Sequence, residues 1–339
     1  MTSTPPLDPA TLDASLTTLA ERCVALRKAL GSVLTGSEEL IEGLLICLIA
    51  GGHGLIEGPP GVGKTLAVKA LSATLGLRLT RVQMTPDLMP SDLIGGSALT
   101  QGEGGAPALS FKEGPLFTEL LFADELNRAN PRAQSALLEA MAERQVSVEG
   151  ETRSLGPPFF VFATQNPVEL EGTFALPAAQ ADRFLCRLLV PLPSEATLSA
   201  LLSYDPRDAL RALRALSPLV DRASLINWPQ LSAHVVVSER LTRRLVTLVM
   251  STRPSHAPTP LAHHLTAGVS PRAAQDLLSA VKARASMVGR PYARDEDLEV
   301  TAPLVLAHRL SLSWEARAVD GLPRQIIHQL LEQSAREPL

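Results

Sequence analysis

The 339-residue chain is poor in aromatic residues and cysteine, and it contains no long apolar run. Its three cysteines, Cys23, Cys47 and Cys186, lie far apart without a CxxC pair, so neither a disulfide framework nor a zinc site is indicated. The longest apolar run, residues 44–50, is far shorter than the ~20 residues of a membrane-spanning helix. No basic residue precedes Arg22, so a secretory signal is not expected and the sequence predicts a cytoplasmic protein.

The chain also lacks a large excess of charge of either sign. Its formal net charge is −4, which predicts no general attraction to nucleic acid or to anionic lipid. Apolar residues make up 45% and charged residues 19%, a balance that supports a packed core and excludes a disordered chain. A chain of this length is too long for one typical domain, so two domains are expected.

Short apolar segments alternate with helical patterns over the first part of the chain. Strands are predicted at 54–57, 79–83, 120–123, 159–163 and 188–192, with helices among them at 65–75 and 130–143. Apolar strands that alternate with helices predict a parallel sheet with helices on both faces, which is an α/β fold.

Beyond residue 193 the pattern changes to helices separated by proline and glycine, such as one over 270–288. We therefore expect an N-terminal helical lead-in at 1–30, an α/β core at 31–193 and a smaller all-helical domain at 194–339. Trp228 and Trp314 are expected to be packing residues of that helical domain.

A phosphate-binding loop is predicted between the first strand and the helix after it. Residues 58–65 fit the pattern G-x-x-x-x-G-K-[ST], and the flanking strand and helix are the context that this pattern requires. The glycines allow backbone N–H groups to surround a phosphate, and the helix N-terminus adds the positive end of a dipole. Lys64 would contact the β- and γ-phosphates, and the Thr65 hydroxyl would bind Mg²⁺. The predicted ATP-binding residues are Gly58, Pro59, Pro60, Gly61, Val62, Gly63, Lys64, Thr65 and Leu66.

Two acidic residues follow the apolar strand at 120–123. Asp124 would hold Mg²⁺, directly or through water, and Glu125 would polarise the attacking water. Acidic residues after a strand are common. Here they follow a phosphate-binding loop with another strand between, which makes the pair a strong signal for ATP hydrolysis.

Taken together, these segments resemble an AAA+ ATPase of the MoxR family, and the resemblance covers most of the chain. Further segments similar to motifs of that family lie at 84–95, 114–117, 124–129, 134–141, 163–167, 182–184 and 268–273. The resemblance implies a P-loop AAA+ domain with a parallel sheet flanked by helices, of the branch with an insert at its second helix, followed by a helical lid. One departure is Ala178, where the family usually has glutamate, so a subunit contact through that glutamate is not expected.

The resemblance also implies roles for three further residues. Asn166 would be the sensor-1 residue that positions the attacking water, and Arg183 the finger that reaches the γ-phosphate of the adjoining subunit. Arg272 would be the sensor-2 residue, acting within its own subunit from the lid. From the residues alone, Asn166 also fits a turn before proline, and Arg183 also fits a surface arginine paired with Asp182.

For function, the resemblance implies an oligomeric ring, a homohexamer, that hydrolyses ATP with Mg²⁺ at subunit interfaces and remodels or helps to assemble a protein partner. The implied partner carries a von Willebrand factor A domain. Two alternatives stay open: a motor subunit of the magnesium-chelatase type, and an ATP-gated scaffold with little turnover. Glu125, Asn166 and Arg183 together favour hydrolysis over a scaffold. Arg128 and Arg132 stay open between contact with a neighbour's nucleotide and ordinary solvated positions.

Two inserts in the α/β core are expected to form hairpins that contact a partner, one within 94–116 and one at 145–155. Glu103, Lys112 and Glu113 are the charged residues of the first, and acidic and basic residues balance around the second. The first insert has a net charge of −1 and the second, counted with its flank, has none, so neither suits phosphate binding, and both argue against nucleic acid as a partner. Phe111 is the one aromatic residue between 81 and 115, which disfavours polypeptide threading and favours local remodelling.

Overall fold

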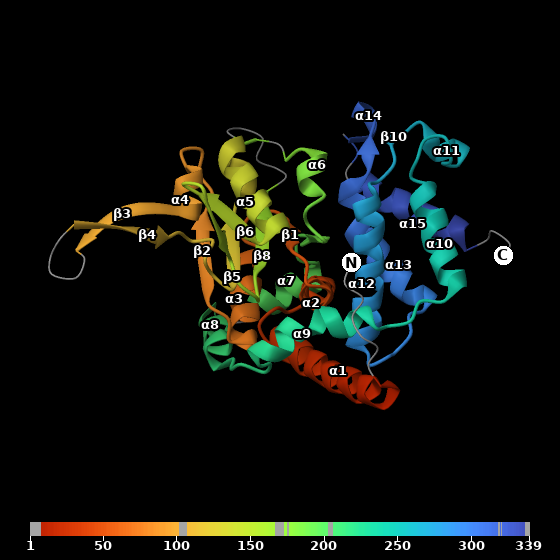
Figure 1. Ribbon diagram of the computed structural model, residues 1–339. Coiled ribbons are helices and arrows are strands. Elements are labelled where there is room, and N and C mark those ends of the chain that lie inside the picture. Colours follow the sequence, from red (N-terminus) through yellow and green to blue (C-terminus); the bar gives the residue numbers. More distant parts are fainter. Residues whose placement is uncertain are drawn as a thin grey trace.

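The computed structural model describes residues 8–101, 107–166, 173–174, 176–202, 206–317, 319 and 321–335. Its centre is a parallel five-stranded sheet with the order β2-β5-β8-β1-β9 (Figure 1). The strands are β1 (Gly54–Glu57), β2 (Leu79–Gln83), β5 (Leu120–Asp124), β8 (Phe160–Gln165) and β9 (Cys186–Leu189). The predicted parallel sheet is confirmed, and the structure adds the order of its strands.

The last strand differs from its predicted bounds because a proline ends it. The pattern places this strand at 188–192, whereas β9 spans Cys186–Leu189. The Val190 N–H donates once more, to the Glu57 carbonyl oxygen at 2.7 Å, and Pro191 then has no N–H with which to continue the ladder. The chain leaves the sheet there and enters α7 (Glu195–Leu202).

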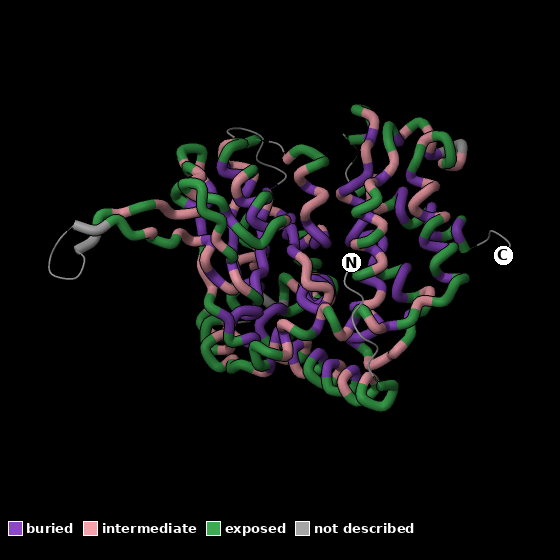
Figure 2. The backbone as a smooth tube through the Cα atoms, viewed as in Figure 1, coloured by how far each residue is buried: buried purple, intermediate pink, exposed green. Residues whose placement is uncertain are grey.

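Helices cover both faces of the sheet. α2 (Glu38–Ala50) and α3 (Lys64–Leu75) lie on one face, and α5 (Pro131–Glu143) lies on the other. Alternate strand residues pack against the two layers: Ile56, Phe122 and Phe162 against the first, and Leu55, Leu121 and Val161 against the second. The three central strands, β1, β5 and β8, are almost entirely buried (purple in Figure 2), whereas the edge strand β2 is mostly half-buried or exposed. Among the described residues no helix, α2 included, is long and apolar enough to cross a membrane.

The N-terminal helix α1 (Pro9–Gly31) packs against the body of the protein. It contacts α2, α3, α9 (Arg222–Ala233) and α12 (Pro271–Met287), so it bridges the sheet domain and the C-terminal helices. Its apolar side chains recur at helical spacing and are almost fully buried: Leu16, Leu19, Cys23, Leu26 and Leu30.

Both expected hairpins are present. α4 (Pro90–Ile94) leads into β3 (Gly95–Gln101) and β4 (Pro107–Glu113), which pair antiparallel and project away from the body (Figure 1). β6 (Gln145–Val148) and β7 (Glu151–Ser154) form the second hairpin. At the base of the first, a Cβ on Gly95 would lie 2.1 Å from the backbone oxygen of Lys112, so only glycine fits there.

The two hairpins touch one another. The guanidinium of Arg153 lies 4.1 Å from the centre of the Phe111 ring, a cation–π contact between the second hairpin and the first. The Ser97 hydroxyl donates to Glu149 Oε2 at 2.5 Å. Phe111 is therefore used to join the hairpins rather than presented as a free aromatic side chain.

The C-terminal part is mainly helical. It comprises α8 (Pro206–Ala215), α9, α10 (Glu239–Met250), α11 (Thr259–Ala262), α12, α13 (Asp295–Leu306), α14 (Trp314–Arg317) and α15 (Leu322–Ser334). The expectation of an all-helical lid is wrong in one detail, because β10 (Leu265–Ala267) and β11 (Ser311–Leu312) pair as a small antiparallel sheet. This pairing satisfies backbone groups in two connections between helices. Trp228 is buried as expected, whereas Trp314 is 79% exposed and packs in no core.

His53 is a buried polar residue in the turn that leads into β1. Its Nδ1 accepts from the Val161 N–H at 3.0 Å, and its Nε2 lies 3.2 Å from the Met141 carbonyl oxygen. The neutral ring with its proton on Nε2 satisfies both contacts. Burial, reinforced by the charge of nearby Arg144, lowers the pKa of His53 to about 3. The ring thus ties β1, β8 and α5 together at the amino ends of the strands.

We expect the free energy of unfolding of the His53→Asn variant to fall less between pH 7.5 and pH 5.5 than that of the wild type. The folded pKa lies below the ordinary value of 6.5, so the contribution of neutral His53 is complete above pH 6.5 and is lost as the pH falls from there toward 3. At pH 5.5 the loss is on the order of 1 kcal/mol, and asparagine, which does not titrate, removes it. Urea unfolding of both proteins at pH 7.5 and 5.5 measures the difference, and equal pH dependence would contradict the assignment.

Candidate active site

The segment between β1 and α3 has the geometry of a phosphate cradle. Gly61 and Gly63 have φ angles of +81° and +91°, which glycine adopts without strain, and Gly63 caps α3. The helix begins at Lys64, so the N–H groups of its first turn and the positive end of its dipole face the loop. Lys64 Nζ donates to the carbonyl oxygens of Gly58 and, at 3.1 Å, of Pro59. The loop therefore offers both backbone donors and a cation, which fits the phosphates of ATP.

Gly58 is required by the packing of this loop against β9. A Cβ there would lie 2.3 Å from the Val190 carbonyl oxygen, a backbone atom that cannot easily move aside. We expect Gly58→Ala to destabilise the fold by about 1–3 kcal/mol and, by displacing the loop, to weaken ATP binding about tenfold or more. Thermal unfolding and calorimetric titration with ATP measure the two effects. Gly31→Ala, where a new Cβ meets nothing within 4 Å, is the matched control, and unchanged ATP binding in Gly58→Ala would contradict the prediction.

Asp124 ends β5 with a carboxylate that is almost buried, 8% exposed. Its Oδ1 accepts from the Thr164 hydroxyl at 2.6 Å, and its Oδ2 pairs with Arg81 at 2.8 Å. Because the strands are parallel, the carboxyl ends of β5 and β1 lie at the same edge with β8 between them. A buried carboxylate and the Thr65 hydroxyl are oxygen donors that suit Mg²⁺, so these residues fit the ion that the sequence predicts.

Glu125 follows Asp124 in a left-handed conformation with φ +60°. Its N–H donates to Thr164 Oγ1 at 2.8 Å, and its Oε2 accepts from Gln83 at 2.7 Å and lies 3.2 Å from Arg128 Nε. A non-glycine residue with positive φ is uncommon, and the two adjacent carboxylates here have different side-chain partners. Arg128, whose place the sequence leaves open, lies against this carboxylate.

Asn166 follows β8, the strand between β5 and β1, and is 6% exposed. Its backbone carbonyl accepts from Asn127 Nδ2 at 3.3 Å. Three strand ends therefore bring the loop at 58–65, the acidic pair and Asn166 to one edge of the sheet. Pro167, on which the alternative interpretation as a simple turn depends, lies outside the described residues.

Arg183 lies at the opposite end of β1 from the phosphate-binding loop. Arg183 follows α6 (Ala178–Ala181) and precedes β9. Just after Arg183, the Leu185 N–H donates to the His53 carbonyl oxygen at 2.9 Å. Cys186 then pairs with Gly54 at the start of β1. The Arg183 Nη1 donates to the Leu138 carbonyl oxygen at 3.1 Å. The expected finger is thus separated by the length of the strand from the loop of its own subunit.

Arg272 lies on the same side as Arg183. It belongs to the first turn of α12, and the residue that caps this helix, Ser270, donates to Asp182 Oδ2 at 2.9 Å. Arg272 itself lies 4.0 Å from Asp276 and is 45% exposed. The sequence predicts that Arg272 acts on the nucleotide of its own subunit. In the structure the amino end of α12 contacts the segment before β9, so Arg272 lies away from the phosphate-binding loop of its own subunit.

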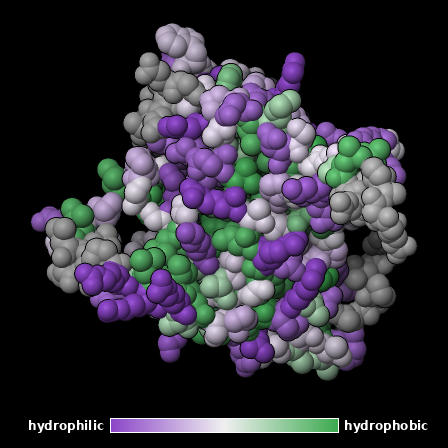
Figure 3. Space-filling view, turned by 90° about the vertical axis from the view of Figure 1, so that its left-hand side faces the viewer, coloured by the Kyte–Doolittle hydropathy of each residue, from purple (hydrophilic) through white to green (hydrophobic). Residues whose placement is uncertain are grey.

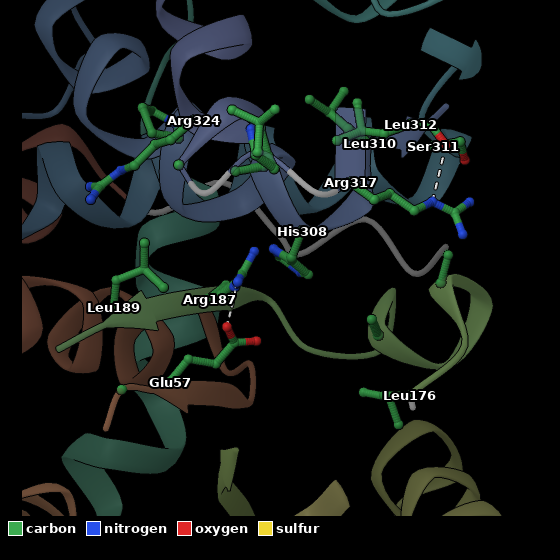
Figure 4. Close-up of a pocket in the computed structure, with 18 of the residues that line it drawn as sticks. Glu57, Leu176, Arg187, Leu189, His308, Leu310, Ser311, Leu312, Arg317 and Arg324 are labelled. Atoms are coloured by element: carbon green, nitrogen blue, oxygen red, sulfur yellow. Dashed lines mark hydrogen bonds and ion pairs between the residues drawn. The ribbon is translucent and has the colours of Figure 1, made fainter. Parts of the chain in front are cut away.

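A cavity of about 700 Å³ separates the ends of β1 and β9 from the lid (Figure 4). Glu57 and Arg187 form an ion pair on its sheet side, and His308 and Arg317 line its lid side. The cavity reaches Gly58, so residues of the lid and the start of the phosphate-binding loop line the same cavity.

Two family models match the chain. The model described as "ATPase family associated with various cellular activities (AAA)" covers residues 53–186, and that of the AAA lid domain covers 261–330. The strand order, the phosphate cradle and these matches define a P-loop ATPase of the AAA class followed by a helical lid.

Relatives over nearly the whole chain narrow the assignment. Chaperone MoxR1 of Mycobacterium tuberculosis is 35% identical over 88% of this chain and 78% of its own length, and Protein MoxR of Methylorubrum extorquens is 32% identical over 92% and 94%. The chain belongs to the MoxR family of AAA+ ATPases. A crystal structure of a candidate ATPase from Cytophaga hutchinsonii, 35% identical, matches with a TM-score of 0.81 over 95% of this chain and 97% of that one.

Proposed function

We propose that the protein hydrolyses ATP with Mg²⁺ in a ring of identical subunits, a hexamer, and uses the cycle in the cytoplasm, where ATP is available, to remodel or assemble a protein partner. One observation carries the proposal. The phosphate-binding loop, Asp124, Glu125 and Asn166 lie at the carboxyl edge of the sheet, whereas Arg183 lies at the amino end of β1. Head-to-tail packing of two copies would bring these halves together, which a single subunit cannot do.

Within one subunit, each residue at the carboxyl edge has a distinct task. Lys64 and the backbone of 58–65 bind the phosphates, and Thr65 and Asp124 hold Mg²⁺, which neutralises charge on the β- and γ-phosphates when bound. Glu125 orients the attacking water and accepts its proton, and Asn166 holds that water in line. Arg183 and Arg272 of a neighbouring subunit would then stabilise the charge that develops on the γ-phosphate.

The first hairpin is the proposed contact with the partner. Leu99 and Leu109 pair across β3 and β4 and are 76% and 74% exposed, an apolar pair held well away from the body. On the face from which this hairpin projects, hydrophobic side chains lie among hydrophilic ones (Figure 3). A surface that mixes apolar and polar side chains is typical of a protein–protein interface, so a protein is the expected partner. We propose that this partner carries a von Willebrand factor A domain, as expected for a MoxR-type chaperone.

The test is ATP turnover per subunit over a wide range of protein concentration, with and without Mg²⁺. A shared site predicts that turnover per subunit rises with concentration as rings form, and that chelation of Mg²⁺ abolishes it. Turnover near zero at all concentrations, despite tight ATP binding, would favour an ATP-gated scaffold or a magnesium-chelatase-type motor subunit that awaits other subunits. Turnover independent of concentration in a protein shown to be monomeric would refute the ring.

A further inference from the structure

A buried arginine of the lid, Arg309, hydrogen-bonds to the residues immediately before and after Arg183. Arg309, in the short helix η3 (Ala307–Arg309), has a side chain that is 1% exposed. Its Nη2 donates to the carbonyl oxygens of Asp182 at 3.0 Å and Phe184 at 2.9 Å. Its Nε also lies 3.0 Å from Asp182 Oδ1. The residues directly before and after the expected finger are therefore bound to one lid side chain.

Two neighbouring lid groups hold the same segment. The His308 Nε2 donates to the Phe184 carbonyl oxygen at 3.0 Å, and burial, together with the charge of Arg309, holds the pKa of His308 well below its usual value, so the ring is neutral. The Ser270 hydroxyl donates to Asp182 Oδ2. The Phe184 side chain is fully buried. The backbone at 182–184 cannot shift without moving the lid.

Arg309 also approaches Arg272, through Asp276. Arg309 Nη2 lies 2.5 Å from Asp276 Oδ2, and Asp276 lies 4.0 Å from Arg272 Nε. Burial raises the pKa of Asp276, and the charge of Arg309 opposes that rise. One buried guanidinium thus lies between two carboxylates, Asp182 beside Arg183 and Asp276 beside Arg272.

We propose that Arg309 is a positioning residue that holds Arg183 and Arg272 as one unit and makes the position of the finger depend on the lid. The inference rests on the proposed function, in which Arg183 serves a neighbouring subunit. The guanidinium places Nε beside the Asp182 carboxylate while its Nη2 contacts the two carbonyl oxygens and Asp276. A lysine ammonium keeps the charge but has one nitrogen, so it cannot occupy both places at once. Misplacement of a catalytic group by about 1 Å can lower a rate by ~10²-fold.

The experiment compares Arg309→Lys with Arg244→Lys in the full-length protein. Arg244 is the matched control, because it is another buried arginine of the lid. Its side chain is 8% exposed and pairs with Asp295 and Glu299 rather than with residues 182–184. We expect Arg309→Lys to lower the turnover number about 10–100-fold with little change in KM for ATP, and Arg244→Lys to leave the turnover number within about threefold of wild type. Thermal unfolding of both variants checks that they are folded.

Mixed rings separate positioning from damage to the whole subunit. Glu125→Gln subunits cannot turn over ATP but carry an intact finger, so mixing them with Arg309→Lys subunits should restore turnover. Arg183→Ala mixed with Glu125→Gln is the reference, and failure of that pair to recover, or full activity of Arg183→Ala alone, overturns the proposed function itself. If the reference pair recovers while Arg309→Lys either keeps full activity alone or is not rescued, the role of Arg309 is refuted and the shared site stands.

Discussion

Arg183→Ala is expected to lower the ATP turnover number by about 10³–10⁵-fold, the range in which a phosphate-directed finger acts. The affinity for ATP should change little, because Arg183 precedes β9 at the amino end of β1 and the loop that binds the phosphates follows the other end of that strand. Negative charge on the γ-phosphate oxygens grows in the transition state, so loss of the guanidinium raises the free energy of the transition state more than that of bound ATP. The loss should therefore appear in kcat rather than in KM.

Steady-state turnover and equilibrium ATP binding, measured on the same samples, test this prediction. Arg211→Ala is the control, since the side chain of Arg211 is 72% exposed and pairs with Asp208 at the surface. Its loss is expected to change neither quantity by more than about twofold. If Arg183→Ala turned over ATP at the wild-type rate in an assembled ring, another residue would have to be the finger, or the site would be complete within one subunit.

Glu125→Gln is expected to lower turnover by about 10²–10⁴-fold while ATP still binds, because the amide keeps the shape of the side chain but cannot accept the proton of the attacking water. The amide can also keep a hydrogen bond with Gln83, whereas its ion pair with Arg128 is lost. The phosphate-binding loop and Asp124 are untouched. The variant should therefore accumulate in the ATP-bound state.

Glu139→Gln is the matched control, because Glu139 is an exposed acid on α5 away from the acidic pair. Single-turnover hydrolysis and retention of ATP after gel filtration distinguish the two variants. Slow hydrolysis with retained ATP is the expected result for Glu125→Gln alone. Loss of ATP binding would instead assign Glu125 to the nucleotide pocket, and unchanged hydrolysis would remove it from the chemistry.

Part of the site could be predicted because its signals are contiguous. The loop at 58–65 is one uninterrupted motif between a strand and a helix, and Asp124 and Glu125 directly follow an apolar strand. Hydrophobic patterning also placed four strands of the central sheet, β1, β2, β5 and β8, within a few residues of their observed bounds. In each of these cases the information lies within about ten neighbouring residues, where local backbone geometry governs the outcome.

Other residues carry no such local signal. Gln83 and Arg81 reach Glu125 and Asp124 from β2, and each pair is more than forty residues apart in the sequence. A single polar residue in a half-buried strand has many ordinary explanations, so neither stood out. Arg309 is a stronger case, because its partner Asp182 lies 127 residues away. Only the packing of the lid on the segment before β9 brings them together.

The sequence by itself determined that this is an α/β P-loop protein with the residues for ATP hydrolysis, because alternation, glycine placement and strand-end acids act over short distances. The tertiary structure alone decided where those residues stand relative to one another. The order of the five strands gathers the loop, the acidic pair and Asn166 at one edge, and the docking of α12 and η3 places Arg272 and Arg309 beside Arg183 at the other. The strand order and the docking of α12 and η3 both depend on packing between segments that are distant in the sequence, and no local pattern specifies such packing.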